Sequence, residues 1–406
     1  MVGGFGALLF LVLGAVGLAA HEGVLVALGG MGALTLGLSW AWQRLCLEDL
    51  SYKREIATVR AFQGEEVDIA VEVRNAKPLP LPRVKVEDDF PEGVALVDGV
   101  LKASPRAGVF LLAHSTALAW YESVQWKYRI RCLRRGYFRF GPARVESGDL
   151  FGFFTSTSQE PTVHHLLVYP RVVPLSELGL PALRPFGDFR RRSWLFQDNT
   201  RPMGIRDYQP GDAMKLVDWK ATARSQALKV REFESTVSHC LVVVLNLDTL
   251  GLAWRAYSSL VLERGVTVAA SVAHDALTRG QMVGLFTNGT SLLYERPMSV
   301  LPARDRRQYL SIFETLAMVG PYLSGTVEEV LERHRARLPF GATLVLVTGV
   351  FTQALAQLFR ELQRVGYGVH VLYVGEGPPE AEVPSLMAFQ DLSPFFRAHE
   401  ATDEWE

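Results

Sequence analysis

Residues 241–248 read Leu-Val-Val-Val-Leu-Asn-Leu-Asp, and this run decides the fold class of the C-terminal half of the chain. Five consecutive apolar residues that end at polar ones are typical of a parallel strand covered on both faces. Similar runs follow at residues 281–286, 343–347 and 369–374. Helical patterns at residues 253–279 and 352–365 lie between them, so we predict a doubly wound α/β domain over residues 238–375.

In such a domain, ligands bind beyond the carboxyl ends of the strands. Asp248, Asn288 and Thr348 each follow or end one of the predicted strands. We therefore expect these three side chains near one rim of the sheet.

Residues 50–175, before this half, show a period of two instead. Val67, Ile69, Val71 and Val73 alternate with mostly polar residues, and the segment from Trp126 to Cys132 does the same. Half-buried strands of an antiparallel sheet have this pattern. Several short strands separated by turn residues predict a small β-sandwich, which we expect to be immunoglobulin-like.

The first 44 residues contain two uncharged apolar runs, at about 2–20 and 24–42, separated only by His21, Glu22 and Gly23. As a helix, each run spans about 28 Å, close to the thickness of the hydrocarbon core of a membrane. A connection this short predicts a transmembrane helical hairpin. Two alternatives stay open: the first run is a cleaved signal peptide, although it lacks a basic start, or both runs are buried core helices.

Basic residues set the expected orientation of this hairpin. Arg44, Lys53, Arg54 and Arg60 follow the second run, whereas the tip of the hairpin has no Lys or Arg. Positive charge favours the cytoplasmic side of a membrane. We therefore expect a multi-pass protein of the cytoplasmic (inner) membrane with its soluble domains in the cytoplasm.

Charge is distributed unevenly in the rest of the chain. The 406 residues contain 42 Lys and Arg against 43 Asp and Glu, which excludes a wholly basic nucleic-acid binder. Residues 184–231 nevertheless hold eleven basic and five acidic residues, and residues 376–406 hold one basic and eight acidic residues. We interpret the first segment as part of a basic linker (176–237) and the second as an acidic C-terminal segment.

The basic linker contains the most distinctive motif of the chain. It reads Gly204-Ile-Arg-Asp-Tyr-Gln-Pro-Gly-Asp212, then Val217-Asp-Trp-Lys-Ala-Thr-Ala-Arg224, then Val230-Arg-Glu-Phe-Glu234. This signature closely resembles that of a bacterial family known as domain of unknown function 58. The segments 135–137, 148–152 and 168–170 also fit the layout of that family. The signature residues are Arg206, Tyr208, Pro210, Gly211, Asp212, Asp218, Trp219, Arg224, Arg231, Glu232 and Glu234.

The resemblance implies that the α/β domain is similar to a von Willebrand factor A domain. Genes of this family often lie beside genes for MoxR-type AAA+ ATPases and sometimes beside genes for transglutaminase-like membrane proteins. The resemblance thus implies an adaptor in the maturation of protein complexes or in cell-envelope processes, with one of these proteins as its partner.

The chemistry of the signature residues gives a separate interpretation. Pro210-Gly211 is typical of a tight turn. Asp212 is placed to cap a helix or to accept hydrogen bonds from Arg206, and we expect Asp218 to pair with Arg224. Trp219 provides a large apolar contact surface. Three roles stay open for the motif: a structural clasp, a surface that docks a partner, and a catalytic site.

A von Willebrand A domain binds Mg²⁺ through a D-x-S-x-S motif, and the corresponding residues here are degenerate. Asp248 and Thr249 retain oxygen atoms, but both serine positions, 250 and 252, are Leu. Thr348 follows the predicted strand at residues 343–347. Metal-binding von Willebrand A domains have a second Asp at the corresponding position. Leu cannot ligate a hard cation, so we expect no metal and no cofactor at this rim.

Other catalytic motifs are missing from the sequence. It has no GxxxxGK[ST] loop, no HExxH and no G-x-S-x-G elbow, and its three cysteines show no CxxC spacing. We therefore expect a binding module and not an enzyme. A structural envelope protein that acts through its membrane hairpin is the alternative.

Overall fold

The structure is a computed structural model of the chain that describes residues 2–180, 202–209, 212, 214–233, 240–250, 257–291, 293, 297–383 and 387–400. It separates into two compact units. The first consists mainly of residues up to Arg171, and the second of most residues from Val172 onward.

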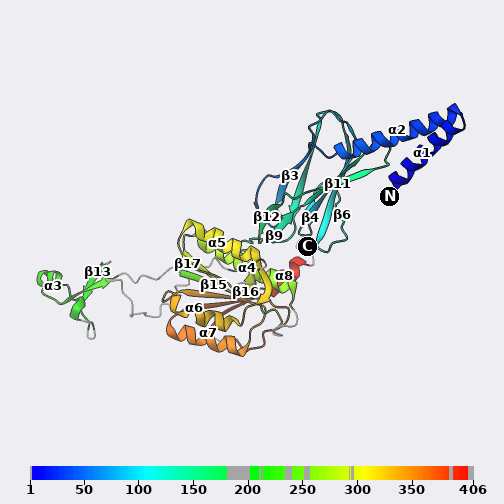
Figure 1. The fold of residues 1–406 in the computed structure, drawn as a ribbon. Coiled ribbons are helices and arrows are strands. Elements are labelled where there is room, and N and C mark those ends of the chain that lie inside the picture. The colour runs from blue at the N-terminus through cyan, green and yellow to red at the C-terminus, as the bar shows by residue number, and fades with distance from the viewer. Residues whose placement is uncertain are drawn as a thin grey trace. The chain divides into compact units, whose positions relative to one another are not determined.

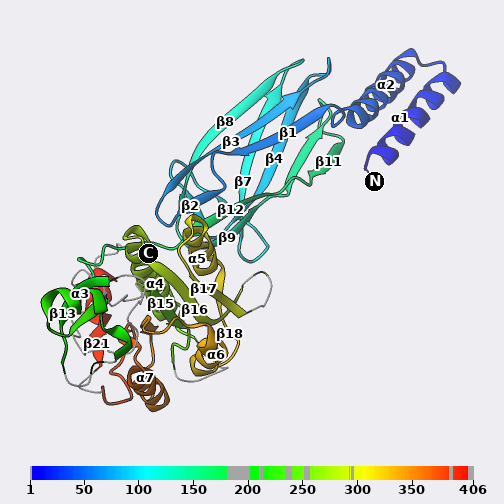
Figure 2. The ribbon, with the colours of Figure 1, turned by 90° about the vertical axis from the view of Figure 1, so that its left-hand side faces the viewer.

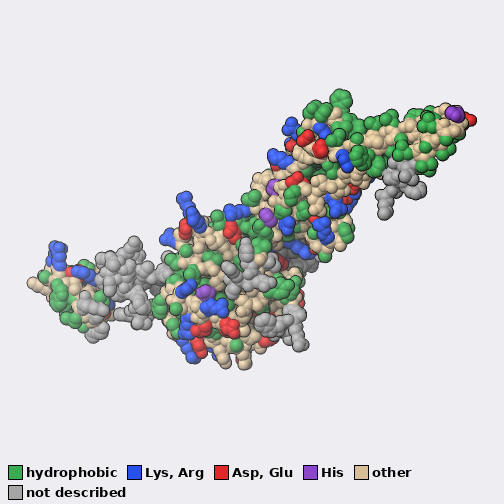
Figure 3. Space-filling view, in the orientation of Figure 1, with side chains coloured by type: hydrophobic (Ala, Val, Ile, Leu, Met, Phe, Trp, Pro, Cys, Tyr) green, Lys and Arg blue, Asp and Glu red, His purple; other side chains and the backbone are tan. Residues whose placement is uncertain are grey.

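The first unit begins with two antiparallel helices, α1 (Val2–Ala19) and α2 (Gly23–Leu45) (Figure 1). They pack closely because a glycine lies at the contact: a Cβ atom on Gly29 would lie 2.4 Å from the backbone nitrogen of Gly14. By length and composition, α2 can cross a membrane, and residues 9–19 of α1 form a shorter apolar helix. Hydrophobic side chains cover much of the surface of α2 (Figure 3).

An antiparallel β-sandwich follows, as the alternating pattern predicted. Its strands are β1 (Leu50–Ile56), β2 (Arg60–Phe62), β3 (Glu66–Asn75), β4 (Leu81–Pro91), β5 (Val94–Leu96), β6 (Lys102–Ala103), β7 (Val109–Leu118), β8 (Ser123–Cys132), β9 (Gly136–Phe140), β10 (Ala143–Gly148), β11 (Thr155–Glu160) and β12 (His164–Tyr169). One sheet has the order β1-β3-β8-β5 and the other β11-β10-β4-β7-β6 (Figure 2). A smaller sheet, β2-β12-β9, includes one parallel pair. Alternate residues of both large sheets point inward and form the core.

The end of α2 is part of this core. Cys46 is fully buried beside Val73, Leu81 and Val84, and Trp42 packs against the same cluster. The buried ammonium group of Lys77 donates hydrogen bonds to the carbonyl oxygen of Cys46, at 2.7 Å, and to that of Glu48. These bonds satisfy carbonyl groups just beyond the end of the helix, which would otherwise lack partners.

The second unit contains the predicted α/β domain. Its elements are β15 (Cys240–Asn246), α4 (Ser259–Thr278), β16 (Met282–Ser291), β17 (Pro297–Ala303), α5 (Arg306–Met318), β18 (Val319–Leu323), α6 (Val327–His334), η2 (Arg335–Arg337), β19 (Thr343–Thr348), α7 (Gln353–Val365), β20 (Gly368–Tyr373), β21 (Ala388–Asp391) and α8 (Ser393–Glu400). The sheet has the order β17-β16-β15-β19-β20-β21. Helices α4 and α5 cover one face, and α6 and α7 cover the other (Figure 1). Strand β15 is buried along its whole length, as its uninterrupted apolar run predicted.

Three strands extend this sheet beyond the four strands that the sequence indicated. Strands β17 and β18 both run antiparallel to β16, and β21 runs parallel to β20. Strand β21 and helix α8 lie within residues 376–406, the predicted acidic C-terminal segment. That segment therefore contributes an edge strand and the buried ring of Phe396 to the α/β domain.

The described residues of the basic linker include helices and strands. Within it, β13 (Pro202–Asp207) and β14 (Lys229–Phe233) form an antiparallel pair, with η1 (Met214–Leu216) and α3 (Trp219–Ser225) between them. We name residues 202–233 the signature hairpin.

Candidate functional site

The signature hairpin brings most of the predicted signature residues into one small structure. Arg206 lies on β13, Trp219 and Arg224 lie on α3, and Arg231 lies on β14. Pro210, Gly211 and Glu234 lie outside the described residues, and Glu232 is described only by its backbone in β14.

The predicted pair of Arg206 and Asp212 is confirmed. Two guanidinium nitrogens of Arg206 donate to the two carboxylate oxygens of Asp212, each at 2.7 Å. The backbone N–H of Gln209 donates to the same carboxylate at 2.8 Å. Arg206 first, and then this N–H, lower the pKa of Asp212. The arrangement holds the connection after β13 against the strand.

The predicted pair of Asp218 and Arg224 is wrong. Asp218 caps α3 by accepting from the N–H groups of Lys220 and Ala221, each at 3.0 Å. Its second oxygen accepts from Nε of Arg231 at 2.8 Å. The return of the chain along β14 brings Arg231 to the carboxylate, whereas Arg224 lies in the last turn of α3. Asp212 and Asp218 thus both form ion pairs within the hairpin.

Apolar side chains are left exposed on the same hairpin. The indole of Trp219 is 63% exposed, and Ile205, Met214 and Leu228 are also exposed. Val217 and Val230 are buried and pair with each other. Tyr208 is half-buried, and its N–H bonds the carbonyl oxygen of Leu228. The signature hairpin is therefore stabilised by internal ion pairs and exposes several apolar side chains, of which Trp219 is the largest.

The second candidate site is the rim at the carboxyl ends of β15 and β19. These neighbouring strands lead to helices on opposite faces, α4 and α7, which makes this position the topological switch point of the sheet (Figure 1). Gly349 allows a close approach here, because a Cβ atom on it would lie 3.5 Å from Cα of Thr249 and 2.4 Å from Val261. The structure thus brings together Asp248, Thr249 and Thr348, as the sequence predicted.

Amide and hydroxyl groups at this rim bond to the chain itself. Asn288 accepts from the N–H of Leu247 at 2.9 Å and donates to the side-chain oxygen of Asn246 at 3.0 Å. Asn246 donates to the hydroxyl of Thr348 at 3.1 Å. The hydroxyl of Thr249 accepts from the N–H of Ser258 at 2.9 Å. These bonds join the ends of three strands and the start of α4.

Asp248 remains the half-buried carboxylate of the rim, and one of its oxygens accepts from the N–H of Leu250 at 3.3 Å. Thr348 is fully buried and already bonds Asn246 and Val350. In the part of the chain that the structure describes, no three His, Cys, Asp or Glu side chains form a cluster suited to a metal ion.

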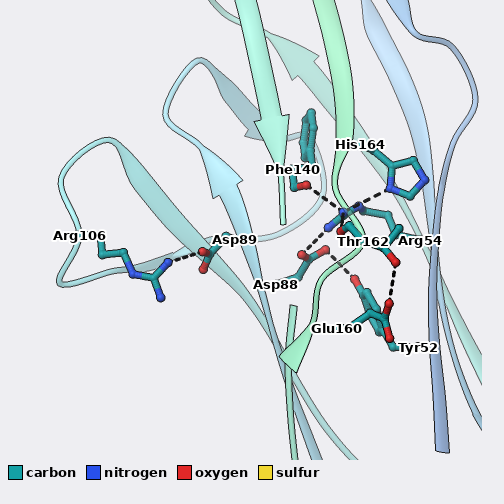
Figure 4. A network of polar contacts seen from close by, with 9 residues as sticks. All are labelled: Tyr52, Arg54, Asp88, Asp89, Arg106, Phe140, Glu160, Thr162 and His164. Atoms are coloured by element: carbon teal, nitrogen blue, oxygen red, sulfur yellow. Dashed lines mark hydrogen bonds and ion pairs between the residues drawn. The ribbon is translucent and has the colours of Figure 1, made fainter. Parts of the chain in front are cut away.

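A third polar cluster, which we did not predict, is buried in the β-sandwich (Figure 4). Arg54 on β1 forms an ion pair with Asp88 on β4, and both side chains are 1% exposed. Arg54 also donates to the carbonyl oxygens of Phe140 and Thr162, at 2.9 and 3.0 Å. The hydroxyl of Tyr52 donates to Asp88 at 2.6 Å, and burial raises the pKa of this tyrosine.

This cluster ties β1 to β4 and β9, so its role is structural. Arg54 is one of the four basic residues that suggested the membrane orientation, yet its charge is neutralised inside the sandwich. A signal was present in the sequence, since Arg54 and Asp88 are polar residues at inward positions of alternating strands, but their pairing depends on the register of distant strands.

The signature hairpin and the α/β domain together match a known protein family. Residues 204–391 match the family described as "Protein of unknown function DUF58". The match confirms the predicted resemblance to this family over these residues. The matched DUF58 region begins in the signature hairpin and ends with strand β21.

A relative and two solved structures are similar to parts of this chain. The chain is 26% identical to "Uncharacterized protein YeaD" of Bacillus subtilis (strain 168) over 326 residues. This alignment covers 77% of the chain and 73% of that relative. The CARDB domain of the PF1109 protein of Pyrococcus furiosus is 12% identical, with a TM-score of 0.21 over 30% of this chain and 92% of that one. A cohesin of Archaeoglobus fulgidus is 11% identical, with a TM-score of 0.21 over 29% of this chain and 91% of that one.

Proposed function

We propose that this DUF58 protein is a membrane-anchored protein-interaction module and not an enzyme. The observation that carries the proposal is the signature hairpin, in which Asp212 and Asp218 form internal ion pairs while Trp219 and other apolar side chains are exposed. Exposed aromatic side chains on a rigid support are typical of protein-binding surfaces. The switch-point rim supports the same proposal, because its amide and hydroxyl groups are used to join strand ends.

The proposed partner is a MoxR-type AAA+ ATPase, and the proposed role is an adaptor in complex maturation or in cell-envelope processes. The family resemblance supports this partner. Figure 3 shows Lys and Arg side chains on one side of the described part of the signature hairpin, next to hydrophobic side chains. Basic side chains in this position would favour an acidic binding surface on the partner.

The proposed location is the inner membrane, with α1 and α2 as a two-helix anchor and the soluble domains in the cytoplasm. The length of α2, its close packing with α1 and the basic Arg44 at its last turn support this orientation.

We also assign finer fold types as part of the proposal. With β18 left aside, the other six strands of the sheet, numbered along the chain, have the order 3-2-1-4-5-6 with an antiparallel third strand. This order supports a von Willebrand A-like domain with a degenerate metal site at Asp248. Two packed antiparallel sheets support an immunoglobulin-like sandwich.

The test is a binding assay between the full-length protein in detergent and the MoxR-type ATPase of the same organism, in each nucleotide state. Trp219→Ala is expected to weaken binding about thirtyfold or more, because a central aromatic residue contributes about 2 kcal/mol or more to an interface. Trp120→Ala is the matched control, since Trp120 is 65% exposed but lies in the β-sandwich.

Equal affinities of wild type and Trp219→Ala, or no binding in any nucleotide state, would contradict the proposal. If Trp219→Ala instead lowers the unfolding temperature of the α/β domain, the hairpin is a structural clasp within the chain.

The alternative function is a structural envelope protein that acts through α1 and α2 with a transglutaminase-like membrane protein. The apolar surface of α2 favours it. Deletion of residues 1–42 separates the two: partner binding that survives the deletion supports the soluble docking surface, and binding that is lost supports the membrane route.

A further inference from the structure

The end of the β-sandwich that receives α2 carries a group of exposed aromatic side chains. Strand pairing defines this end. Leu50 lies opposite Asn75, Leu118 lies opposite Leu81, and Ser147 lies opposite Val84. The connection from α2 to β1, the turn 119–122 and the loop 149–154 therefore lie together, and we name them the helix-proximal end.

Five large apolar side chains of the helix-proximal end are more than half exposed. They are Trp120, Tyr121, Leu150, Phe151 and Phe153. Hydrophobic side chains continue from α2 onto the adjoining end of the sandwich (Figure 3). Contiguous exposed apolar surface of this kind marks a protein or membrane contact.

Internal hydrogen bonds hold the loop 149–154 in shape. The buried carboxylate of Asp149 accepts from the N–H groups of Phe151 and Phe154, at 3.0 and 2.7 Å. Burial raises the pKa of Asp149, but these N–H groups outweigh it and the pKa is lowered overall. Gly152 has a φ of +74°, so the chain turns between the two exposed rings of Phe151 and Phe153, which stack at 5.9 Å.

The turn 119–122 is held in the same way. The carboxylate of Glu122 accepts from the N–H of Ala119 at 2.6 Å, and the amide of Asn75 donates to the carbonyl oxygen of Ala119 at 2.9 Å. Trp120 and Tyr121 are thus displayed by a closed turn. Fixed aromatic side chains lose little conformational entropy when they insert into a binding surface.

The loop 149–154 is fixed beside the last turns of α2. Gln43 donates to the carbonyl oxygen of Thr155 at 3.1 Å, and the hydroxyl of Ser156 donates to the carbonyl oxygen of Gln43 at 3.3 Å. Nearby on the helix, the guanidinium of Arg44 lies 3.9 Å from the ring centre of Trp40. Trp40 is about 26 Å along the helix from Gly23, where a membrane-spanning helix reaches the interface between hydrocarbon and water.

We infer that the helix-proximal end binds the lipid interface, inserting Phe151, Phe153 and Trp120 at the level of Trp40. Aromatic rings concentrate at this depth, where apolar atoms meet acyl chains and polar atoms meet water. The inference rests on the proposed membrane anchoring by α2. It adds that the β-sandwich is a second, peripheral membrane contact, and that the occupant of the patch is lipid and not protein.

The test uses full-length protein in phosphatidylcholine vesicles with a polarity-sensitive dye on a single cysteine. Cys46, Cys132 and Cys240 are buried, so Phe151→Cys and Trp120→Cys introduce accessible thiols for selective labelling. Val100→Cys is the control, because Val100 is 91% exposed and follows β5. Leu96 of β5 pairs with Ile130, which lies near the end of β8 that is away from the turn 119–122.

Dyes at positions 151 and 120 are expected to emit at shorter wavelength than the dye at position 100. They are also expected to be quenched several-fold more strongly by lipids brominated near the headgroup. Quenching equal to that at position 100 would overturn the inference. A blue shift without lipid quenching would indicate a protein on this surface and would also overturn it.

Flotation of the same vesicles after an alkaline wash tests the anchoring separately. Protein that floats but shows no quenching at position 151 refutes the lipid contact alone. Protein that does not float refutes the anchoring, and the lipid contact with it.

Discussion

Asn288 is an uncharged side chain that holds the centre of the α/β sheet together. It is 1% exposed, accepts from the backbone of Leu247 and donates to Asn246, so it links the ends of β15 and β16. A buried N–H that loses its only partner costs about 1–3 kcal/mol. The bonds that join these two strands at the rim are therefore made by amide side chains.

We expect Asn288→Ala to lower the free energy of unfolding of the α/β domain by about 1–3 kcal/mol, because the N–H of Leu247 loses its acceptor. Pulsed thiol labelling of Cys240, which is buried in β15, measures this unfolding in urea. Gln353→Ala, at an exposed position on α7, should change it by less than about 0.5 kcal/mol. Identical urea midpoints for wild type and Asn288→Ala would contradict the prediction.

Single residues also show where sequence reasoning failed. The pairing of Arg206 with Asp212 was predictable because the two lie close in sequence. The partner of Asp218 was not, because Arg231 reaches it only when β14 returns beside β13. The ion pair of Arg54 with Asp88 was missed for the same reason: its partners come from strands that are distant in sequence.

At the scale of elements, the junction between α2 and β1 depends on one buried cation. Lys77 lies in the connection after β3, and its ammonium group bonds two carbonyl oxygens that follow α2. Burial lowers the pKa of Lys77. The side chain therefore stays in the core because of these acceptors.

We expect Lys77→Met to loosen this junction, because the carbonyl groups of Cys46 and Glu48 lose their donor. Labelling of the buried Cys46 thiol should accelerate about 5- to 150-fold, which corresponds to about 1–3 kcal/mol. Cys132, in β8, should label at an unchanged rate if the effect is local. Lys102→Met, at an exposed position, is the control, and equal rates at Cys46 in both variants would refute the prediction.

Elements with a strong hydrophobic period were predictable from the sequence, and short edge elements were not. The uninterrupted apolar run of β15 predicts a strand that is buried on both faces. The alternation in β3 and β8 predicts strands with one buried face. Strand β21 has four residues that are mostly half-buried, and neither β13 nor β14 has a continuous apolar run, so each is stabilised by its neighbours in space. Local sequence carries little information about such strands.

At the scale of the whole molecule, the two units should respond to acid independently. Burial lowers the pKa of His370, on β20, to about 4, whereas an unfolded histidine titrates near pH 6.5. Between these values the unfolded chain takes up a proton that the folded domain excludes. Stability from this group is therefore complete above about pH 6.5 and declines as the pH falls toward 4.

We expect His370→Gln to reduce the acid sensitivity of the α/β domain, measured as the pH dependence of the labelling midpoint of Cys240. The midpoint for Cys132 in the β-sandwich should keep its own pH dependence. His399→Gln, on α8 of the same unit, is the control. An unchanged pH profile for Cys240 in His370→Gln would contradict the assignment.

The direct packing of α2 into the β-sandwich has a mechanical consequence. Only residues 46–49 separate α2 from β1, and Cys46 within them is fully buried. No flexible joint is therefore available to absorb rotation between helix and sandwich. If α2 tilts when the bilayer thins, the sandwich must rotate with it as a rigid unit. The thickness of the membrane would then set the angle between the β-sandwich and the membrane plane.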